Sequence, residues 1–80
     1  LRALILAAIA DFARSAAGGL TADEVHEYTA KTEHEKHDVR RLMEIRRRTS
    51  DLHTRMKKIR DTGLRRTNRS GNPMIVWTPV

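Results

Sequence analysis

Cysteine is absent from the sequence, proline occurs only twice, and the aromatic residues are one Phe, one Trp and one Tyr. Without cysteine the chain has neither disulfide bonds nor thiolate metal sites, so packing alone must stabilise it. A chain of 80 residues buries only a modest core. These absences predict a single domain over residues 1–80, in a reducing compartment such as the cytoplasm.

A long apolar run is also missing. The longest one covers residues 3–10, which is too short to cross a bilayer. A preceding arginine makes a signal-peptide core conceivable, but Asp11 and Arg14 follow at once and the helical periodicity continues through Phe12. We therefore expect a globular helix here and a protein that does not enter the membrane. Because the chain begins with Leu1 rather than Met, we also expect residues upstream or a longer parent protein.

Catalytic motifs are missing as well. The sequence has no HExxH zinc motif, no phosphate-binding GxxxxGK[ST] loop, and no serine in a nucleophile-elbow context. His34 and His37 stand one helical turn apart and could share a metal, but no further ligand cluster accompanies them, so exposed histidines on a charged helix are the simpler interpretation. We expect a protein that is not an enzyme and that needs no cofactor and no metal.

Positive and negative charge are separated along the chain. Residues 1–39 contain four Lys/Arg and seven Asp/Glu, a net charge of −3, whereas residues 40–80 contain twelve Lys/Arg and three Asp/Glu, a net charge of +9. A merely solubilising surface would mix the two signs, and segregated positive charge is typical of a protein that binds a polyanion. The alternatives are a solvated basic face and, less well supported, an amphipathic segment on an anionic membrane, because the aromatic or Leu-rich face that enters lipid is missing.

Apolar periodicity predicts two helices in the first part of the chain, over residues 2–16 and 22–30. Gly18-Gly19 should end the first helix, and Thr21 with Glu24 forms a capping box for the second, which should bury Val25 and Tyr28. A small apolar side of the first helix is either surplus helix-forming alanine or the contact surface of a homodimer. The expected buried face is Leu4, Ile5, Ala8, Ile9, Phe12 and Ala16, and the small apolar side is Ala3, Leu6, Ala7 and Ala10.

The basic half of the chain predicts two more helices and a hairpin. A third helix is expected over residues 33–47, unless the second helix simply continues, and a fourth begins at Thr49 or Ser50 and ends at Gly63. Leu52, Met56 and Ile59 follow one stripe of this fourth helix at i, i+4 and i+7. Strands over residues 64–67 and 74–78 should then pair across a turn at residues 68–73, with Ile75 and Trp77 on one face.

On these residues the chain resembles the winged helix-turn-helix DNA-binding domains of small bacterial and phage regulators. Leu-Thr-Ala-Asp-Glu-Val at residues 20–25 looks like the opening of that family's second helix, and residues 49–67 look like a recognition helix running into the first wing strand. The resemblance implies a mainly α fold with a C-terminal β-hairpin, a recognition helix at about residues 50–62 in the major groove, and a wing at residues 64–78 on the adjacent backbone or minor groove. The family usually joins its second and recognition helices by a few residues, so residues 31–48 imply an extra or extended helix.

The resemblance also implies which side chains touch DNA. Base edges would face Ser50, Asp51, Thr54 and Lys57, although an acidic residue in a first turn is also favoured simply by the helix dipole. Trp77 could stack on a base, but a Trp that alternates on a strand more often belongs to the core. Phosphate contacts are expected from Arg46, Arg47, Arg48, Arg55 and Lys58, with Arg65 and Arg66 on the wing strand and Arg69 at its tip toward the minor groove.

The sequence therefore predicts a sequence-specific, cytoplasmic, nucleoid-associated protein that binds double-stranded DNA, as a transcriptional regulator or a phage or plasmid maintenance factor. The alternative is a winged-helix protein–protein interaction module within a larger assembly. The polar face of the fourth helix favours DNA, because a docking surface for proteins would be more apolar. A homodimer through the first helix would extend the short site that one domain can cover.

Overall fold

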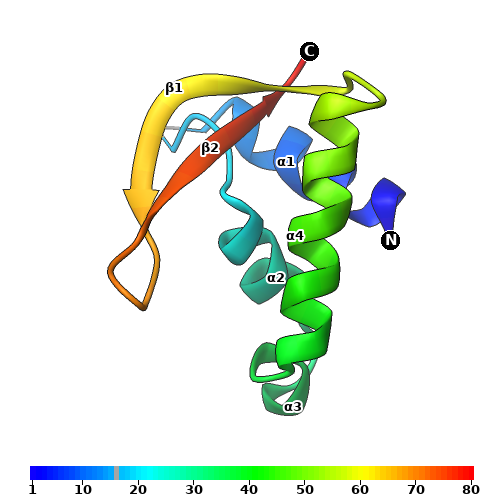
Figure 1. The fold of residues 1–80 in the computed structure, drawn as a ribbon, viewed down its shortest axis with the longest axis vertical. Helices are drawn as coiled ribbons and strands as arrows, with labels where there is room; N and C mark the ends of the chain where they lie inside the picture. Colours follow the sequence, from blue (N-terminus) through cyan, green and yellow to red (C-terminus); the bar gives the residue numbers. More distant parts are fainter. Residues whose placement is uncertain (16) are drawn as a thin grey trace.

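A computed structural model describes residues 1–15 and 17–80, and it has four helices followed by a hairpin (Figure 1). The elements in chain order are α1 (Arg2–Ala13), α2 (Ala22–Thr29), α3 (Glu33–Lys36), α4 (Val39–Thr54), β1 (Ile59–Thr67) and β2 (Pro73–Pro79). The mainly helical fold with a C-terminal hairpin is thus confirmed. In the part of the chain that the structure describes, no helix is both long enough and apolar enough to cross a membrane.

The core lies where α1, α2 and α4 meet the base of the hairpin. Aliphatic side chains from all of these elements are fully buried, and Trp77 on β2 is 8% exposed among them. The core assignment of Trp77 is therefore confirmed. The largest fully buried aliphatic side chains are Ile5, Ile9, Val25, Ile45, Leu52, Ile59 and Val76.

The two strands pair in an antiparallel register from Ile59 opposite Pro79 to Thr67 opposite Pro73, with an irregularity between Asp61 and Arg65. The predicted hairpin is confirmed, and its first strand starts earlier than the sequence indicated. Outside the hairpin, Leu20 adds a single bridge to β2. Its N–H donates to the Trp77 carbonyl at 3.2 Å, and its carbonyl accepts from the Trp77 N–H at 2.8 Å.

Gly19 makes this bridge possible. It is buried with φ 139°, and a Cβ built there would overlap the Trp77 carbonyl oxygen. The backbone between α1 and α2 can approach β2 this closely only because residue 19 has no side chain. The connection between the first two helices is thereby fixed to the base of the hairpin.

The first two helices follow the sequence in part. The Thr21–Glu24 capping box is present in both directions, at 3.1 and 2.8 Å, so α2 begins where predicted. Two burial predictions were wrong. Tyr28 is 52% exposed and packs edge-on against Phe12 at 4.8 Å, and Leu4 is 46% exposed. The end of α1 is Ala13, and the predicted helical position Ala16 lies outside the described residues.

The predicted third and fourth helices were wrong in their boundaries. One continuous helix, α4, covers most of the predicted third helix and the first part of the predicted fourth, and α3 is a single turn before it. Thr49 does not cap a new helix, because its hydroxyl donates to the Ile45 carbonyl at 2.6 Å inside α4. The helix ends at Thr54, so the predicted recognition helix at residues 50–62 does not exist as such, and its second half is a turn and the start of β1.

Candidate nucleic-acid interface

The tip of the hairpin is a compact loop built by Asn68. Its side-chain carbonyl oxygen accepts from the backbone N–H groups of Ser70 and Asn72, at 3.0 and 2.9 Å. Gly71 has φ 83°, in the left-handed region that favours glycine. The sequence Asn-Arg-Ser-Gly-Asn-Pro thus forms its turn with its own side chain, and Arg69 and Ser70 remain exposed at the end of the hairpin.

The hairpin is held against α2 by Arg66. Its guanidinium donates to the Glu24 carboxylate at 2.7 Å, to the Ala17 carbonyl at 2.8 Å and to the Gly19 carbonyl at 2.7 Å. Its side chain is only 31% exposed. The guanidinium N–H groups of Arg66 thus donate to acceptors within the protein, so this arginine positions the hairpin.

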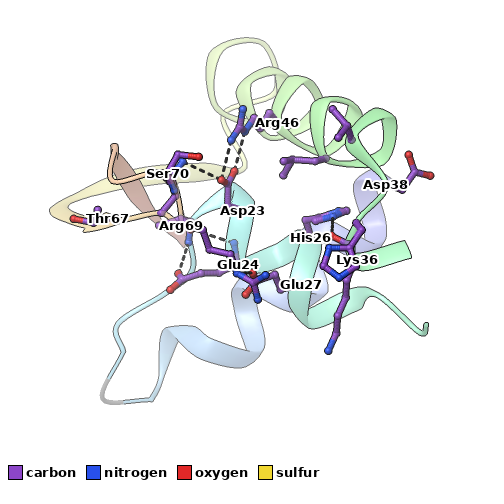
Figure 2. Close-up of a pocket in the computed structure, with 15 residues that line it drawn as sticks. Asp23, Glu24, His26, Glu27, Lys36, Asp38, Arg46, Thr67, Arg69 and Ser70 are labelled. Carbon is purple, nitrogen blue, oxygen red and sulfur yellow. Dashed lines mark hydrogen bonds and ion pairs between the residues drawn. The ribbon is translucent and has the colours of Figure 1, made fainter. Parts of the chain in front are cut away.

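A second carboxylate, Asp23, joins three elements. It accepts from the Nε and Nη2 atoms of Arg46 on α4, both at 2.8 Å, and from the Asn68 amide of the hairpin tip at 3.2 Å. Arg69 pairs with Glu27 of α2 at 2.8 Å but remains 77% exposed. Figure 2 shows these side chains converging from the hairpin tip, α2 and α4. The hairpin tip therefore has a defined position relative to α4.

The two carboxylates that fix the hairpin have lowered pKa values. The hydrogen bond from Arg46 is the largest effect on Asp23, and it lowers the pKa of that carboxyl against the opposing effect of burial. Burial is the largest single effect on Glu24 and acts to raise its pKa, but hydrogen bonds from Arg66 and Thr21 together lower it. Both groups are therefore stabilised in their ionised form.

A groove of about 380 Å³ separates the hairpin tip from the start of α4, and α2 forms its floor (Figure 2). Its walls include Val39 and Leu42 on one side and Arg69 and Ser70 on the other. The start of α4 and the hairpin tip thus border one common depression.

The exposed side of α4 forms a stripe along the whole helix. Its members recur at spacings of three and four residues, as expected for one helical face. Val39 is 67% and Met43 is 54% exposed, and Arg40 has no carboxylate within ion-pair distance among the described residues. This recognition stripe consists of Val39, Arg40, Met43, Arg47, Ser50 and Thr54.

The first half of α4 is fixed to α2 by His26 and Arg41. His26 is 3% exposed, and its Nε2 and Nδ1 atoms lie 2.9 Å from the Lys36 carbonyl and from Arg41 Nη1. Because the carbonyl only accepts and the guanidinium only donates, Nε2 carries the proton. Arg41 also donates to the His26 carbonyl at 2.8 Å and to the Thr29 hydroxyl at 2.7 Å. These contacts set the direction in which α4 leaves the short α3 turn.

The predicted DNA-binding residues separate into groups. Arg46 and Arg66 are occupied by Asp23 and Glu24, so their guanidinium groups stabilise the fold. Ser50 and Thr54 are exposed on α4, but in its second half. Three more of the predicted arginines have carboxylate partners on their own element: Arg47 and Arg48 share Glu44, and Arg65 pairs with Asp61. Asp51 is half-buried, with the Arg55 guanidinium 3.8 Å away. Lys57 and Lys58 lie in the turn after α4, and Arg69 lies at the hairpin tip.

The sequence analysis did not identify the N-terminal end of the stripe, formed by Val39, Arg40 and Met43, as part of the candidate site. The available signal was Asp38, whose carboxylate accepts from the Arg41 N–H at 3.2 Å and caps α4. An Asp before a segment with apolar periodicity is a helix-start signal as good as the one at Thr49.

The proposed dimer surface on α1 is only partly free. Ala3, Ala7 and Ala10 are exposed, but Leu6 packs against the core. A charged residue substituted at Leu6 would therefore disturb the core of the single chain and could not test the dimer contact alone. The homodimer stays a prediction.

No family model, no curated protein and no solved structure matches the chain.

Proposed function

We propose that the protein binds double-stranded DNA as a winged helix-turn-helix domain, with α4 as the recognition helix and the β1–β2 hairpin as the wing. The observation that carries the proposal is that the recognition stripe begins at Val39, which lines one wall of the groove whose opposite wall is formed by Arg69 and Ser70 of the hairpin tip. In this arrangement the short helix α3 lies in the connection between α2 and the recognition helix, where the sequence implied an extra or extended helix.

The chemistry of the stripe fits the major groove. Arg40 and Arg47 supply guanidinium groups for guanine edges or phosphates, and Ser50 supplies a hydroxyl. Val39 and Met43 supply apolar contact for a thymine methyl group. At the wing tip, Arg69 can exchange its exposed pair with Glu27 for a phosphate, because an exposed ion pair contributes little net stability. This arrangement supports sequence-specific binding and a regulatory or maintenance role on DNA.

The test is duplex binding measured over a salt series, together with selection of bound sequences from a random pool. Log affinity should fall with log salt concentration at a slope of about −0.9 per phosphate contacted. An Arg40→Gln/Arg47→Gln variant should weaken binding at the selected site and change its sequence preference. The matched control is Arg14→Gln, which removes an exposed arginine at the end of α1 and should leave binding unchanged.

Two results would contradict the proposal. Absence of duplex binding in dilute salt would remove DNA as the partner and favour a protein-docking module. Equal loss of binding to selected and random sequences in the double variant would mean that α4 contacts phosphates without reading bases.

A further inference from the structure

A second group of cations lies at the other end of α4, where the chain turns into β1. The basic turn, as we name it, consists of Arg55, Lys57, Lys58 and Arg60. All four are exposed, and Arg55 is 81% exposed. Among the described residues, only Arg55 comes near a carboxylate, at 3.8 Å from Asp51. The basic turn therefore has charge available for an external partner.

The backbone under these side chains is fixed. The Lys58 N–H donates to the Leu52 carbonyl at 2.9 Å, and the Lys58 carbonyl accepts from the Val80 N–H at 3.1 Å. Ile59 is 1% exposed, and because successive strand residues point to opposite sides, Lys58 and Arg60 both point to solvent. The cations thus project from a constrained segment of chain.

Lys57 occupies a position that favours glycine. Its φ is 52°, and an L-residue in the left-handed region costs about 1–2 kcal/mol relative to the right-handed conformation. The C-terminal end of α4 carries roughly half a negative charge, which favours nearby cations but offsets only a fraction of four of them. A lysine at this position keeps a positive charge in the turn, although glycine would adopt the same left-handed conformation without the steric penalty.

The basic turn is distant from the start of the recognition stripe. At about 1.5 Å per residue, the 16 residues of α4 extend roughly 24 Å. The longest dimension of the molecule is 31 Å, and Figure 1 shows the turn after α4 at one end of this axis and α3 with the start of α4 at the other. A duplex that contacts the first half of the stripe and the wing tip therefore lies toward the opposite end of the long axis from the basic turn.

We propose that the basic turn binds the phosphate backbone of a second DNA duplex, so that one copy of the protein bridges two segments of DNA. This inference rests on the proposed DNA-binding function. Lysine ammonium groups act as point charges toward phosphates and carry no base specificity. The basic turn has no aromatic side chain on which unpaired bases could stack, which favours a duplex over a single strand.

The experiment uses two short duplexes, each long enough for one domain. One is biotinylated and fixed to beads, and the other carries a fluorophore. The protein should retain the fluorescent duplex on the beads in dilute salt. A Lys57→Gly/Lys58→Gln/Arg60→Gln variant should lower this capture at least about tenfold, because cations that neutralise phosphates are lost. Its affinity for a single duplex should stay within about threefold, because the recognition stripe is intact.

Controls separate the charge effect from folding and from dimerisation. A Lys58→Arg/Arg60→Lys variant keeps both charges and should bridge like the wild type. If the triple variant unfolds at a lower temperature, the Lys58→Gln/Arg60→Gln variant, which leaves the turn at Lys57 untouched, replaces it. Unchanged capture by the neutralised variant would overturn the proposal, because another surface, such as a dimer contact, would then join the duplexes.

The remaining outcomes distinguish this inference from the proposed function. Binding of one duplex without capture of a second would overturn bridging alone. A large loss of single-duplex affinity in the triple variant would also overturn it, because the basic turn would then touch the same duplex as α4. Absence of any duplex binding by the wild type would contradict the proposed function and bridging together.

Discussion

Arg66 and Arg60 lie on the same strand and contribute equally to the net charge, yet their surroundings differ completely. Arg66 is held by the Glu24 carboxylate and by two backbone carbonyls of the connection between α1 and α2. Arg60 is exposed near the start of β1 and has no carboxylate partner among the described residues. The excess of positive charge in the second half therefore has two parts, one that holds the hairpin in place and one that faces solvent. Counting charges along a sequence cannot separate them.

The largest expected effect that tests this comparison is the loss of Arg66. Arg66→Ala should lower the free energy of unfolding by about 2–3 kcal/mol, because charge-assisted hydrogen bonds are lost and partly buried acceptors remain unsatisfied. Urea denaturation of the purified protein measures the change. Arg60→Ala is the control and should stay within about 0.5 kcal/mol of the wild type. Equal effects of the two substitutions would abolish the distinction between structural and solvent-facing cations.

A smaller effect is expected at Asp23, with a defined pH dependence. Asp23→Asn should cost about 1 kcal/mol near neutral pH, because the amide has only one acceptor oxygen and no negative charge to pair with the Arg46 guanidinium. Since the folded-state pKa of Asp23 is lowered, its stabilising contribution is complete above the ordinary carboxyl pKa of about 4 and is lost as the pH falls through the folded value.

The measurement for Asp23 is the free energy of unfolding between neutral and acid pH for both proteins. The difference between wild type and Asp23→Asn should shrink toward acid pH. A constant difference over the whole range would mean that the contribution of Asp23 does not depend on its charge.

The smallest effect is expected in the basic turn itself. Lys57→Gly should raise the free energy of unfolding by up to about 1 kcal/mol, because glycine relieves the left-handed conformation at φ 52° while losing more conformational entropy on folding. Lys57→Ala is the matched control, since it removes the same charge and keeps the strain. Thermal unfolding of the two variants measures the difference, and a Lys57→Gly protein less stable than Lys57→Ala would show that the turn is not strained.

Local patterns predicted the parts of the fold that local interactions build. The Thr21–Glu24 capping box, the hairpin and the buried Trp77 all follow from neighbouring residues or from strand alternation. The boundaries of α4 were not predictable in the same way, because Thr49 can either cap a helix or bond to the carbonyl four residues earlier, and tertiary packing decides between them.

The candidate site was less accessible to sequence reasoning. The pairs Glu24–Arg66 and Asp23–Arg46 join residues far apart in the chain, and no short pattern announces them. The polar tip at Asn68 was predictable as a turn, but its bond to Asp23 was not. Which cations are free depends on such distant partners, so the unpaired cations of the second half of the chain could be identified only from the fold.

The backbone bridge between Leu20 and Trp77 also imposes an order on folding. Ile5 and Ile9 of α1 share a core with Trp77, so α1 and α2 cannot complete their packing until β2 has been synthesised and has closed onto Leu20. Contacts between such distant parts of a chain form late and limit the folding rate. A nascent chain that stops short of β2 would have exposed helices and no hairpin. The hairpin would then take up its position in one step, together with the final packing of the core.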